Sequence, residues 1–273
     1  MSAILGELSV AKMHGTHNEF LIVDERAAPL ADPGALAQRW CDPASGLGAD
    51  GLLVVGAPPP AGDDLVTMRI FNADGSEAEM CGNGIRCVAR YLQERGAPDR
   101  FSVVTLAGSI AIELLERAPE YRVRADVGRP VLVDGGREQT IEAAGCTWTY
   151  RAVSLGNPHA VIFVKDISGI DVERAGAAIA AHPHFSRGTN VHFVQRAGLH
   201  RIRVRHYERG VGITQSCGTG AVASAVVAIE TGAAQSPVQV DVPGGSLIVA
   251  WRAGESATLA GPAEKVFERT IAL

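Results

Sequence analysis

Two cysteines, Cys81 and Cys217, stand in nearly the same sequence context. Each begins a Cys-Gly-x-Gly segment followed by an apolar run, in CGNGIRCVA at 81–89 and in CGTGAVASA at 217–225. The apolar runs predict helices, so each thiol should lie at a helix N-terminus, where unpaired N–H groups and the helix dipole stabilise negative charge. A thiol in that position is expected to have a lowered pKa and to serve as a base. The glycines leave the backbone amides open to a carboxylate.

Two such thiols suit the inversion of a stereocentre. One thiolate removes an α-proton, the other thiol returns a proton to the opposite face, and the roles exchange in the reverse reaction. Many epimerases instead use pyridoxal phosphate, which needs a lysine for its Schiff base. The three lysines, Lys12, Lys165 and Lys265, lie outside any glycine-rich phosphate-binding context. We therefore expect no cofactor, and a site closed to water in which helix ends stabilise the developing charge.

Other uses of these cysteines have weaker support. A zinc site would need Cys81 together with Cys87, but no C-x-x-C spacing occurs, so we expect no metal. A thiol hydrolase would pair one cysteine with His159 or His206, and the duplication would then serve no purpose. We expect the remaining cysteines to be small core residues: Cys41, Cys87 and Cys146.

The similarity between the two cysteine segments extends along the chain. An arginine lies twelve residues before each cysteine, at Arg69 and Arg205. An asparagine that opens a predicted strand precedes them by 63 and 60 residues, at Asn18 and Asn157. A Gly-Ser pair follows them by 27 and 28 residues. These landmarks in register indicate two homologous halves.

Each half is predicted to be a mixed α/β (α+β) domain in which a sheet or barrel wraps around the helix that follows its cysteine. We expect the first half to cover 1–124 together with a C-terminal strand at 265–273, and the second to cover 125–264. Short aliphatic and β-branched runs predict strands at 20–25, 51–55, 67–73, 102–107, 110–115, 121–127, 160–166, 190–195, 202–207, 238–242 and 246–251. Helices are expected within 31–43, 84–96, 167–183 and 218–232.

Composition narrows the class of protein. The chain has 273 residues, 47% of them hydrophobic, and a net charge of −5, so it lacks the basic excess that neutralises nucleic-acid phosphates. No run of eighteen apolar residues predicts a membrane span. The first residues, MSAILGELSVAKMHG, lack the basic and apolar regions of a signal peptide, and we expect a cytoplasmic protein with reduced thiols.

Five segments resemble the diaminopimelate epimerase family, whose members interconvert LL- and meso-diaminopimelate without pyridoxal phosphate, in the synthesis of lysine and peptidoglycan precursors. They are MHGTHNEFLIVD (13–24), FNADGSEAEMCGNGIRCVARYL (71–92), VSLGNPHAVIFV (153–164), GTNVHFVQ (188–195) and YERGVGITQSCGTGA (207–221). The related proline and hydroxyproline racemases share the fold and the cysteine pair but lack MCGNGIRC. The resemblance covers nearly the whole chain.

The resemblance implies a role for each matching position. Cys81 and Cys217 would be the acid–base pair, and His159 and Glu208 would tune their pKa values. Glu208 would also receive the α-ammonium group, and Arg209 would bind the distal carboxylate. Residues at the helix starts would contact the α-carboxylate: Gly82, Asn83, Gly218 and Thr219. Asparagine amides would bind the distal amino-acid head, since they both donate and accept hydrogen bonds: Asn18, Asn72, Asn157 and Asn190.

Some positions depart from the family's pattern. Gly51 stands where glutamine is frequent, and Ile213 where an acidic residue is usual, which leaves room for a different substrate preference. Glu19 replaces an aspartate, and Phe267 replaces a tyrosine linked to dimer formation; we expect a homodimer. The competing hypotheses are a racemase or epimerase of another polar amino acid and a noncatalytic amino-acid-binding protein. The other histidines are interpreted as surface or structural residues: His14, His17, His182, His184, His192, His200 and His206.

Overall fold

The computed structural model describes residues 7–117 and 120–272, and these form two compact units. The first unit runs through Ala125 and includes the chain from Pro262 onward; the second is Asp126–Gly261. The second unit thus begins at residue 126, where the sequence predicts 125. The chain rejoins the first unit at residue 262, where the sequence predicts 265.

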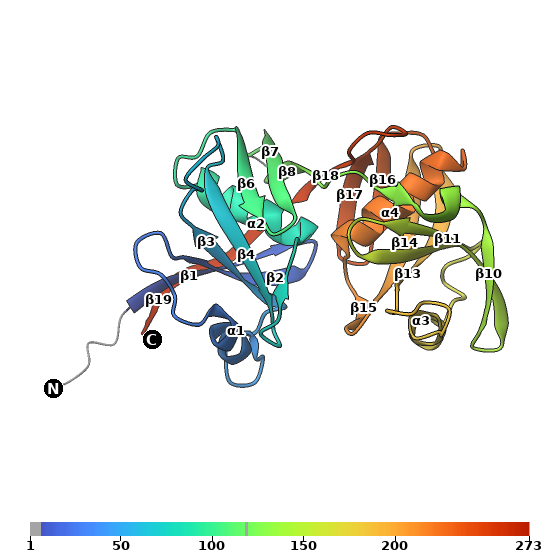
Figure 1. Ribbon diagram of the computed structural model, residues 1–273, viewed down its shortest axis with the longest axis horizontal. Coiled ribbons are helices and arrows are strands. Elements are labelled where there is room, and N and C mark those ends of the chain that lie inside the picture. The colour runs from blue at the N-terminus through green and yellow to red at the C-terminus, as the bar shows by residue number, and fades with distance from the viewer. Residues whose placement is uncertain (1–6, 118–119, 273) are drawn as a thin grey trace. The chain divides into compact units, whose positions relative to one another are not determined.

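The first unit is a curved mixed sheet with two helices (Figure 1). Along the sheet, β19 pairs with β1, β1 with β2, β2 with β3, β3 with β4, β4 with β6, β6 with β7, and β7 with β8. Only β2–β3 and β4–β6 are parallel. The elements are β1 (Glu7–Gly15), β2 (Asn18–Asp24), α1 (Pro33–Cys41), β3 (Gly51–Gly56), β4 (Val66–Asn72), β5 (Glu77–Ala78), α2 (Gly82–Gln93), β6 (Arg100–Thr105), β7 (Gly108–Glu116), β8 (Arg122–Asp126) and β19 (Glu264–Ala272).

Helix α2 forms the centre of this unit's core. Ile85, Val88 and Leu92 recur at helical spacing and pack with Met13 and Leu53 of the strands. The chain enters the helix through two glycines, and a Cβ on Gly84 would lie 3.1 Å from a methyl group of Leu53, so the first turn sits tightly against the sheet.

The second unit has its own sheet, with helices α3 and α4. Here β10 and β9 pair with β11, followed by β11–β12, β12–β13, β13–β14, β14–β16, β16–β17 and β17–β18. Its elements are β9 (Val131–Leu132), η1 (Val133–Gly136), β10 (Gln139–Ala143), β11 (Cys146–Ser154), β12 (Pro158–Phe163), α3 (Val172–Ala180), β13 (Asn190–Gly198), β14 (Arg201–Glu208), β15 (Gly212–Thr214), α4 (Gly218–Glu230), β16 (Val238–Val242), β17 (Gly245–Ala250) and β18 (Thr258–Pro262).

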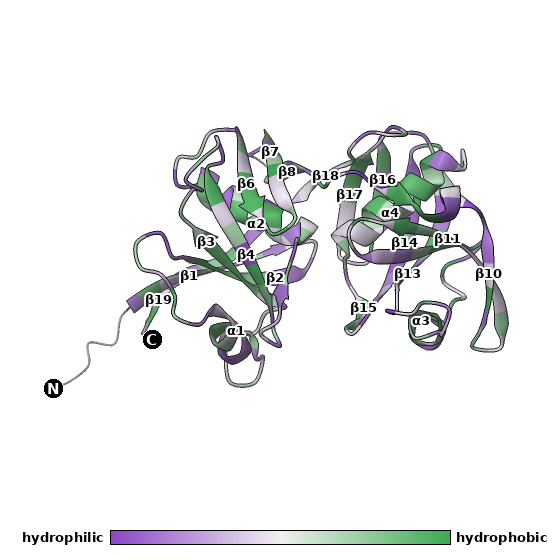
Figure 2. Ribbon diagram, viewed as in Figure 1, coloured by the Kyte–Doolittle hydropathy of each residue, from purple (hydrophilic) through white to green (hydrophobic). Residues whose placement is uncertain are grey.

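Helix α4 is apolar around nearly its whole circumference, as Figure 2 shows by its green colour. A helix of that kind is stable only when it is surrounded by other elements. It packs against β11, β12, β13, β14, β16 and β17, and its Ala and Val side chains are almost completely buried. The sheet of the second unit therefore wraps around this helix.

The two units repeat one topology. In each, an antiparallel pair leads through a helix into a parallel pair, as β1–β2–α1–β3 and as β11–β12–α3–β13. Each then continues through an antiparallel strand, a short strand and the cysteine helix to a second parallel pair, β4–β6 and β14–β16. The α+β class with two pseudo-symmetric halves, each a mixed sheet around a helix, follows from these pairings.

Sequence patterns located most of the strands and all four helices, with several omissions. Strands β1, β10, β11 and β18 were not predicted, and neither were the two- or three-residue strands. The expectation that Cys146 is a core residue is wrong, because it begins β11 directly after a tight turn at Ala144 and Gly145, both with positive φ, and is exposed. Cys41 and Cys87 are buried as expected.

Candidate active site

Cys81 caps the N-terminus of α2. Its backbone is extended (φ −139°, ψ 115°), and its Sγ accepts a hydrogen bond from the N–H of Gly84 at 3.3 Å. Its thiol donates a long, 4.0 Å hydrogen bond to Oδ1 of Asn18, which begins β2. The first turn of α2 therefore directs the Gly84 N–H toward the sulfur, and a helix N-terminus is a position in which a thiolate is stabilised.

A polar network that runs from the exposed Asp50 to the buried Arg86 holds this helix start. Asn83 Nδ2 donates to Asn18 Oδ1 at 3.1 Å, and Asn18 Nδ2 donates to Asp50 Oδ2 at 2.7 Å. The fully buried Arg86 donates to Asn83 Oδ1 at 2.9 Å and to the carbonyl of Gly82 at 2.8 Å. The two asparagines expected at the site thus lie together beside Cys81, with orientations fixed by charged neighbours.

Asn72 lies at the same end of the sheet, because its strand β4 pairs in register with the start of β3 at Gly51. Its Nδ2 donates to Ser76 Oγ at 2.9 Å, which closes the turn after β4. A Cβ on Gly51 would lie 2.7 Å from the carbonyl oxygen of Phe71. No side chain fits at position 51, so a glutamine contact from this position is not available in this protein.

Cys217 caps α4 with nearly the same backbone as Cys81 (φ −122°, ψ 111°), but it is only 5% exposed. Burial raises the pKa of the Cys217 thiol well above its usual value, and the Glu208 carboxylate, to which the thiol donates a hydrogen bond, adds to this. The N–H of Gly220 and the hydroxyl of Thr219 lower the pKa by less. The expectation of a lowered pKa is therefore wrong for Cys217, because loss of water outweighs the helix end. The thiol is protonated at neutral pH.

Glu208 ends β14, and its Oε1 accepts a 2.5 Å hydrogen bond from Thr214 Oγ1 of the neighbouring strand β15. This hydroxyl and the Cys217 thiol converge on one carboxylate. A carboxylate at this place can pair with a cation such as an ammonium group.

Two further predicted residues stand at the neighbouring strand ends. Asn190 begins β13, and its amide donates to the carbonyl of Pro158 at 3.0 Å and accepts from the N–H of Arg209 at 3.0 Å. Its side chain therefore ties together the segments that carry Asn157 and Arg209. The exposed guanidinium of Arg209 donates to the carbonyl of Arg187 at 2.5 Å.

A line of buried imidazoles runs inward from this site. His159 Nε2 lies 2.8 Å from Oδ1 of Asn157, whose Nδ2 donates to Thr219 Oγ1 at 3.4 Å. His159 Nδ1 lies 2.8 Å from His192 Nε2, and His192 Nδ1 lies 2.8 Å from His206 Nδ1. We call His159, His192 and His206 the histidine row. His159 is thus connected to Cys217 through Asn157 and Thr219 rather than by direct contact.

Acid is expected to destabilise the protein through the histidine row. Burial lowers the pKa of His159 and of His206 from 6.5 to about 3, and it lowers the pKa of His192 as well; electrostatic interactions with His206 and Arg209 lower the pKa of His159 further. Below pH 6.5 the unfolded chain therefore binds protons that the folded chain excludes, and stability falls as pH decreases toward 3.

Each histidine of the row lowers the free energy of unfolding by up to about 1.4 kcal/mol for each pH unit of acidification. Urea unfolding at pH 7, 6 and 5 measures this slope, and His206→Leu should reduce it by about a third, since one histidine of three is removed. An unfolding free energy that does not change between pH 7 and pH 5 would contradict the buried, neutral row.

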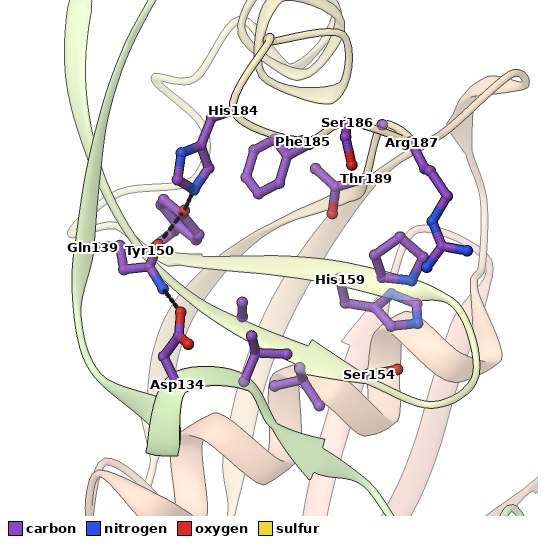
Figure 3. Close-up of a pocket in the computed structure, with 15 residues that line it drawn as sticks. Asp134, Gln139, Tyr150, Ser154, His159, His184, Phe185, Ser186, Arg187 and Thr189 are labelled. Carbon is purple, nitrogen blue, oxygen red and sulfur yellow. Dashed lines mark hydrogen bonds between the residues drawn. The ribbon is translucent and has the colours of Figure 1, made fainter.

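A pocket of about 270 Å³ opens on the second unit (Figure 3). Tyr150 and Gln139 lie on one side of it, where the Tyr150 hydroxyl bonds His184 Nε2 at 2.7 Å and Gln139 Nε2 donates to Asp134 at 2.8 Å. His159 lies on the other side. Cys217, Glu208 and Asn157 are not part of its lining. The pocket therefore shares His159 with the histidine row but does not include the Cys217 thiol.

The structure also describes the groups around the other candidate uses of the cysteines. Cys87 is fully buried in the core of the first unit, and burial raises its pKa to about 12. His206 is separated from Cys217 by the rest of the histidine row. Within residues 7–117 and 120–272, no group of His, Cys, Asp and Glu side chains is arranged to hold a metal ion. The helices of the same residues include none long and apolar enough to span a membrane.

Sequence reasoning missed Asp50, Arg86 and the two inner histidines as parts of the network. A signal for His206 was present, since Ile202, Val204 and His206 alternate along β14 and all point inward. Arg86 interrupts an apolar helix face and could have been noticed. Asp50 carried no signal, because its contact with Asn18 depends on the register of two strands that are distant in sequence.

Comparison with known proteins places the chain in a family. A family model described as diaminopimelate epimerase matches residues 10–133 and 151–266. The diaminopimelate epimerase of Pelotomaculum thermopropionicum is 45% identical over 272 residues, which cover 94% of this chain and 96% of that protein. The diaminopimelate epimerase of Synechocystis sp. is 41% identical over 277 residues, which cover 95% and 97%.

A solved structure supports the fold independently. The hydroxyproline epimerase from Agrobacterium vitis, with trans-4-hydroxy-L-proline bound, matches with a TM-score of 0.74 at 15% identity, covering 100% of this chain and 94% of that chain. A likeness at that identity bears on the fold alone. The family is established by sequence: a family model spans most of the chain, and relatives above 40% identity match nearly all of it. The chain therefore belongs to the diaminopimelate epimerase family.

Proposed function

We propose that this protein interconverts LL- and meso-diaminopimelate without pyridoxal phosphate, and that Cys81 and Cys217 are its acid–base pair. The observation that carries the proposal is the matched placement of the two thiols. Each caps the helix at the centre of its unit, with the same extended backbone and with Gly-x-Gly behind it. This is the arrangement that family membership leads us to expect at the reacting centre.

The two thiols differ in their burial and in their hydrogen-bond partners. Cys217 is protonated in the ligand-free protein, so it is ready to donate a proton. Cys81 is less buried and accepts an N–H hydrogen bond at its sulfur, which suits a thiolate that removes one. In this scheme Cys81 takes the α-proton of one isomer while Cys217 delivers a proton to the opposite face. The next turnover in the reverse direction exchanges the roles.

The remaining groups would bind the substrate. The N–H groups at the two helix starts, behind Gly82 and Gly218, would hold the α-carboxylate, and Glu208 would accept the α-ammonium group. Arg209 and the asparagines at the strand ends, Asn18 and Asn72 among them, would bind the distal carboxylate and ammonium group. Diaminopimelate is zwitterionic at both ends, so it would use all of these groups.

The direct test is isomerisation of LL-diaminopimelate by purified protein without added pyridoxal phosphate, followed by separation of the LL and meso isomers. We expect conversion that is unaffected by a carbonyl reagent such as hydroxylamine, which removes pyridoxal phosphate. Conversion of another polar amino acid in preference to diaminopimelate would contradict the proposed substrate. Binding without any conversion would favour a noncatalytic amino-acid-binding protein.

We also propose that the protein is a cytoplasmic homodimer. Val266 on β19 is 52% exposed, and Phe267 beside it occupies the position that the resemblance links to dimer formation. An acidic side chain in an apolar contact is costly, so Val266→Glu should convert a dimer into monomers in light scattering. A wild-type monomer would contradict the dimer. The cytoplasm would keep the catalytic thiols reduced.

A further inference from the structure

The histidine row has no part in the chemistry proposed above, yet it leads to one of the two thiols. It begins deep in the second unit at His206, whose exposed fraction is 0%, and reaches the half-buried Asn157 through His159. Asn157 contacts Thr219, and Thr219 Oγ1 lies 3.7 Å from Cys217 Sγ. Five successive contacts therefore connect a buried imidazole to the sulfur.

Counting donors and acceptors fixes the direction of these hydrogen bonds. A neutral imidazole has one N–H and one bare nitrogen. Asn157 presents Oδ1, which only accepts, so His159 donates from Nε2 and accepts at Nδ1. His192 must then donate from Nε2 and accept at Nδ1, and His206 must donate from Nδ1. All three tautomers follow from the orientation of one amide.

The inner end of the row favours the same direction. When His206 donates from Nδ1, its Nε2 carries a bare lone pair. This Nε2 atom is buried without a hydrogen-bond partner among the described residues. The opposite direction would place an N–H at that position instead. A buried N–H without an acceptor is rarer in proteins than an under-used acceptor. The low pKa values of the row agree with three neutral rings.

The outer end of the row, at Asn157, determines which group donates a hydrogen bond to the Cys217 sulfur. Because Asn157 uses Oδ1 for His159, its Nδ2 faces Thr219 and donates to the hydroxyl oxygen. The hydroxyl hydrogen is then left to point at Cys217 Sγ. Every donor in the line points toward the sulfur, and hydrogen bonds in such a series polarise one another. A hydroxyl that donates to the sulfur favours the thiolate over the thiol.

We infer that His192 and His206 are positioning residues for the Cys217 thiol: they hold His159 in the tautomer that orients Asn157 and so direct the Thr219 hydroxyl to the sulfur. Neither histidine touches the sulfur. Gly220, in the first turn of α4, makes the arrangement possible, since a Cβ there would lie 2.4 Å from the His192 ring. The catalytic role of this thiol rests on the proposed function. The direction of the hydrogen bonds is argued independently of that function.

Two substitutions at one buried site separate positioning from mere packing. His206→Leu removes the donor to His192, so the row can reverse and the Thr219 hydroxyl can turn away from the sulfur. His206→Asn keeps an N–H donor near the place of Nδ1. We expect His206→Leu to slow alkylation of Cys217 by iodoacetamide about tenfold at pH 9, a shift of about one pKa unit, and His206→Asn to leave the rate close to that of the wild type.

The rate is followed at the Cys217 peptide by mass spectrometry, with the exposed Cys146 as an internal reference. A purely structural role predicts the opposite order, because leucine suits a buried site better than asparagine. Unchanged alkylation in His206→Leu, or equal slowing in both variants, would overturn the inference.

Nuclear magnetic resonance of ¹⁵N-histidine-labelled wild-type protein tests the same inference without mutation. We expect the N–H at Nε2 in His159 and His192 and at Nδ1 in His206, with all three rings neutral at pH 7. An N–H at Nε2 of His206, or a charged ring, would overturn it. Neither experiment depends on turnover, so a failure of the proposed epimerase activity would be seen separately, in the diaminopimelate assay.

Discussion

Replacing Cys81 or Cys217 with serine is expected to reduce kcat for diaminopimelate isomerisation by about 10²–10⁴-fold, the usual contribution of a positioned acid or base. A serine hydroxyl is several pKa units less acidic than a thiol, so it neither removes the α-proton nor returns one at a useful rate. Each single variant should lose most of the activity, because every turnover needs both groups. Initial rates from the separation of the LL and meso isomers measure the loss.

The chain offers a control for these variants. Cys146 is exposed at a turn of the second unit, and Cys146→Ser should leave kcat within about twofold, as surface substitutions usually do. Calorimetric titration should show that the two active-site variants still bind diaminopimelate, since Glu208 and Arg209 remain. Retention of more than a tenth of the wild-type kcat in either active-site variant would mean that its thiol is not an acid or base of the reaction.

The largest effect on stability is expected for Arg86→Met, a loss of about 3–5 kcal/mol in the free energy of unfolding. The guanidinium is fully buried and donates to three acceptors, the carbonyl of Gly82, Oδ1 of Asn83 and the carbonyl of Pro262. Methionine fills much of the space but leaves all three acceptors without these donors. Burial also lowers the pKa of Arg86 to about 10, so it remains charged at neutral pH.

Arg90 supplies the matched comparison, one turn further along α2. It also donates to the returning chain, at the carbonyl of Ala263, but its side chain is 22% exposed, so water can replace what is lost. Arg90→Met should therefore cost only about 1 kcal/mol. Urea unfolding of both variants measures the difference, with Arg86→Lys as an alternative if Arg86→Met does not fold. Equal losses at the two positions would show that the polar network around Cys81 is not held by Arg86.

Much of the arrangement was predictable from sequence because it is repeated. The matched Cys-Gly-x-Gly segments, with Arg69 and Arg205 in register, predict two halves and a thiol at each helix start. Strands rich in Val, Ile and Leu were evident, whereas β1 and β11 mix polar and apolar residues and were missed. Their assignment depends on partner strands that are distant along the chain.

Energetic details were less predictable than positions. The helix-end argument gave the wrong direction for the pKa of Cys217, since it ignored burial and the nearby Glu208 carboxylate, which only the folded structure reveals. The histidine row was likewise hidden, because His159, His192 and His206 come from three strands brought together by register. The asparagines were identified through the resemblance, but their protein partners, Asp50 and Arg86 above all, were not.

The central claim is that two separate groups, one on each face of the α-carbon, carry the proton. Isomerisation of LL-diaminopimelate in D₂O, stopped at low conversion and examined by mass spectrometry, tests it most directly. The account predicts that the meso product carries one deuterium at the inverted carbon, delivered by a thiol that has exchanged with solvent, while the remaining LL substrate keeps its protium. Product that retains the original hydrogen, or substrate that gains deuterium as fast as product forms, would indicate a single base and would contradict the two-thiol mechanism.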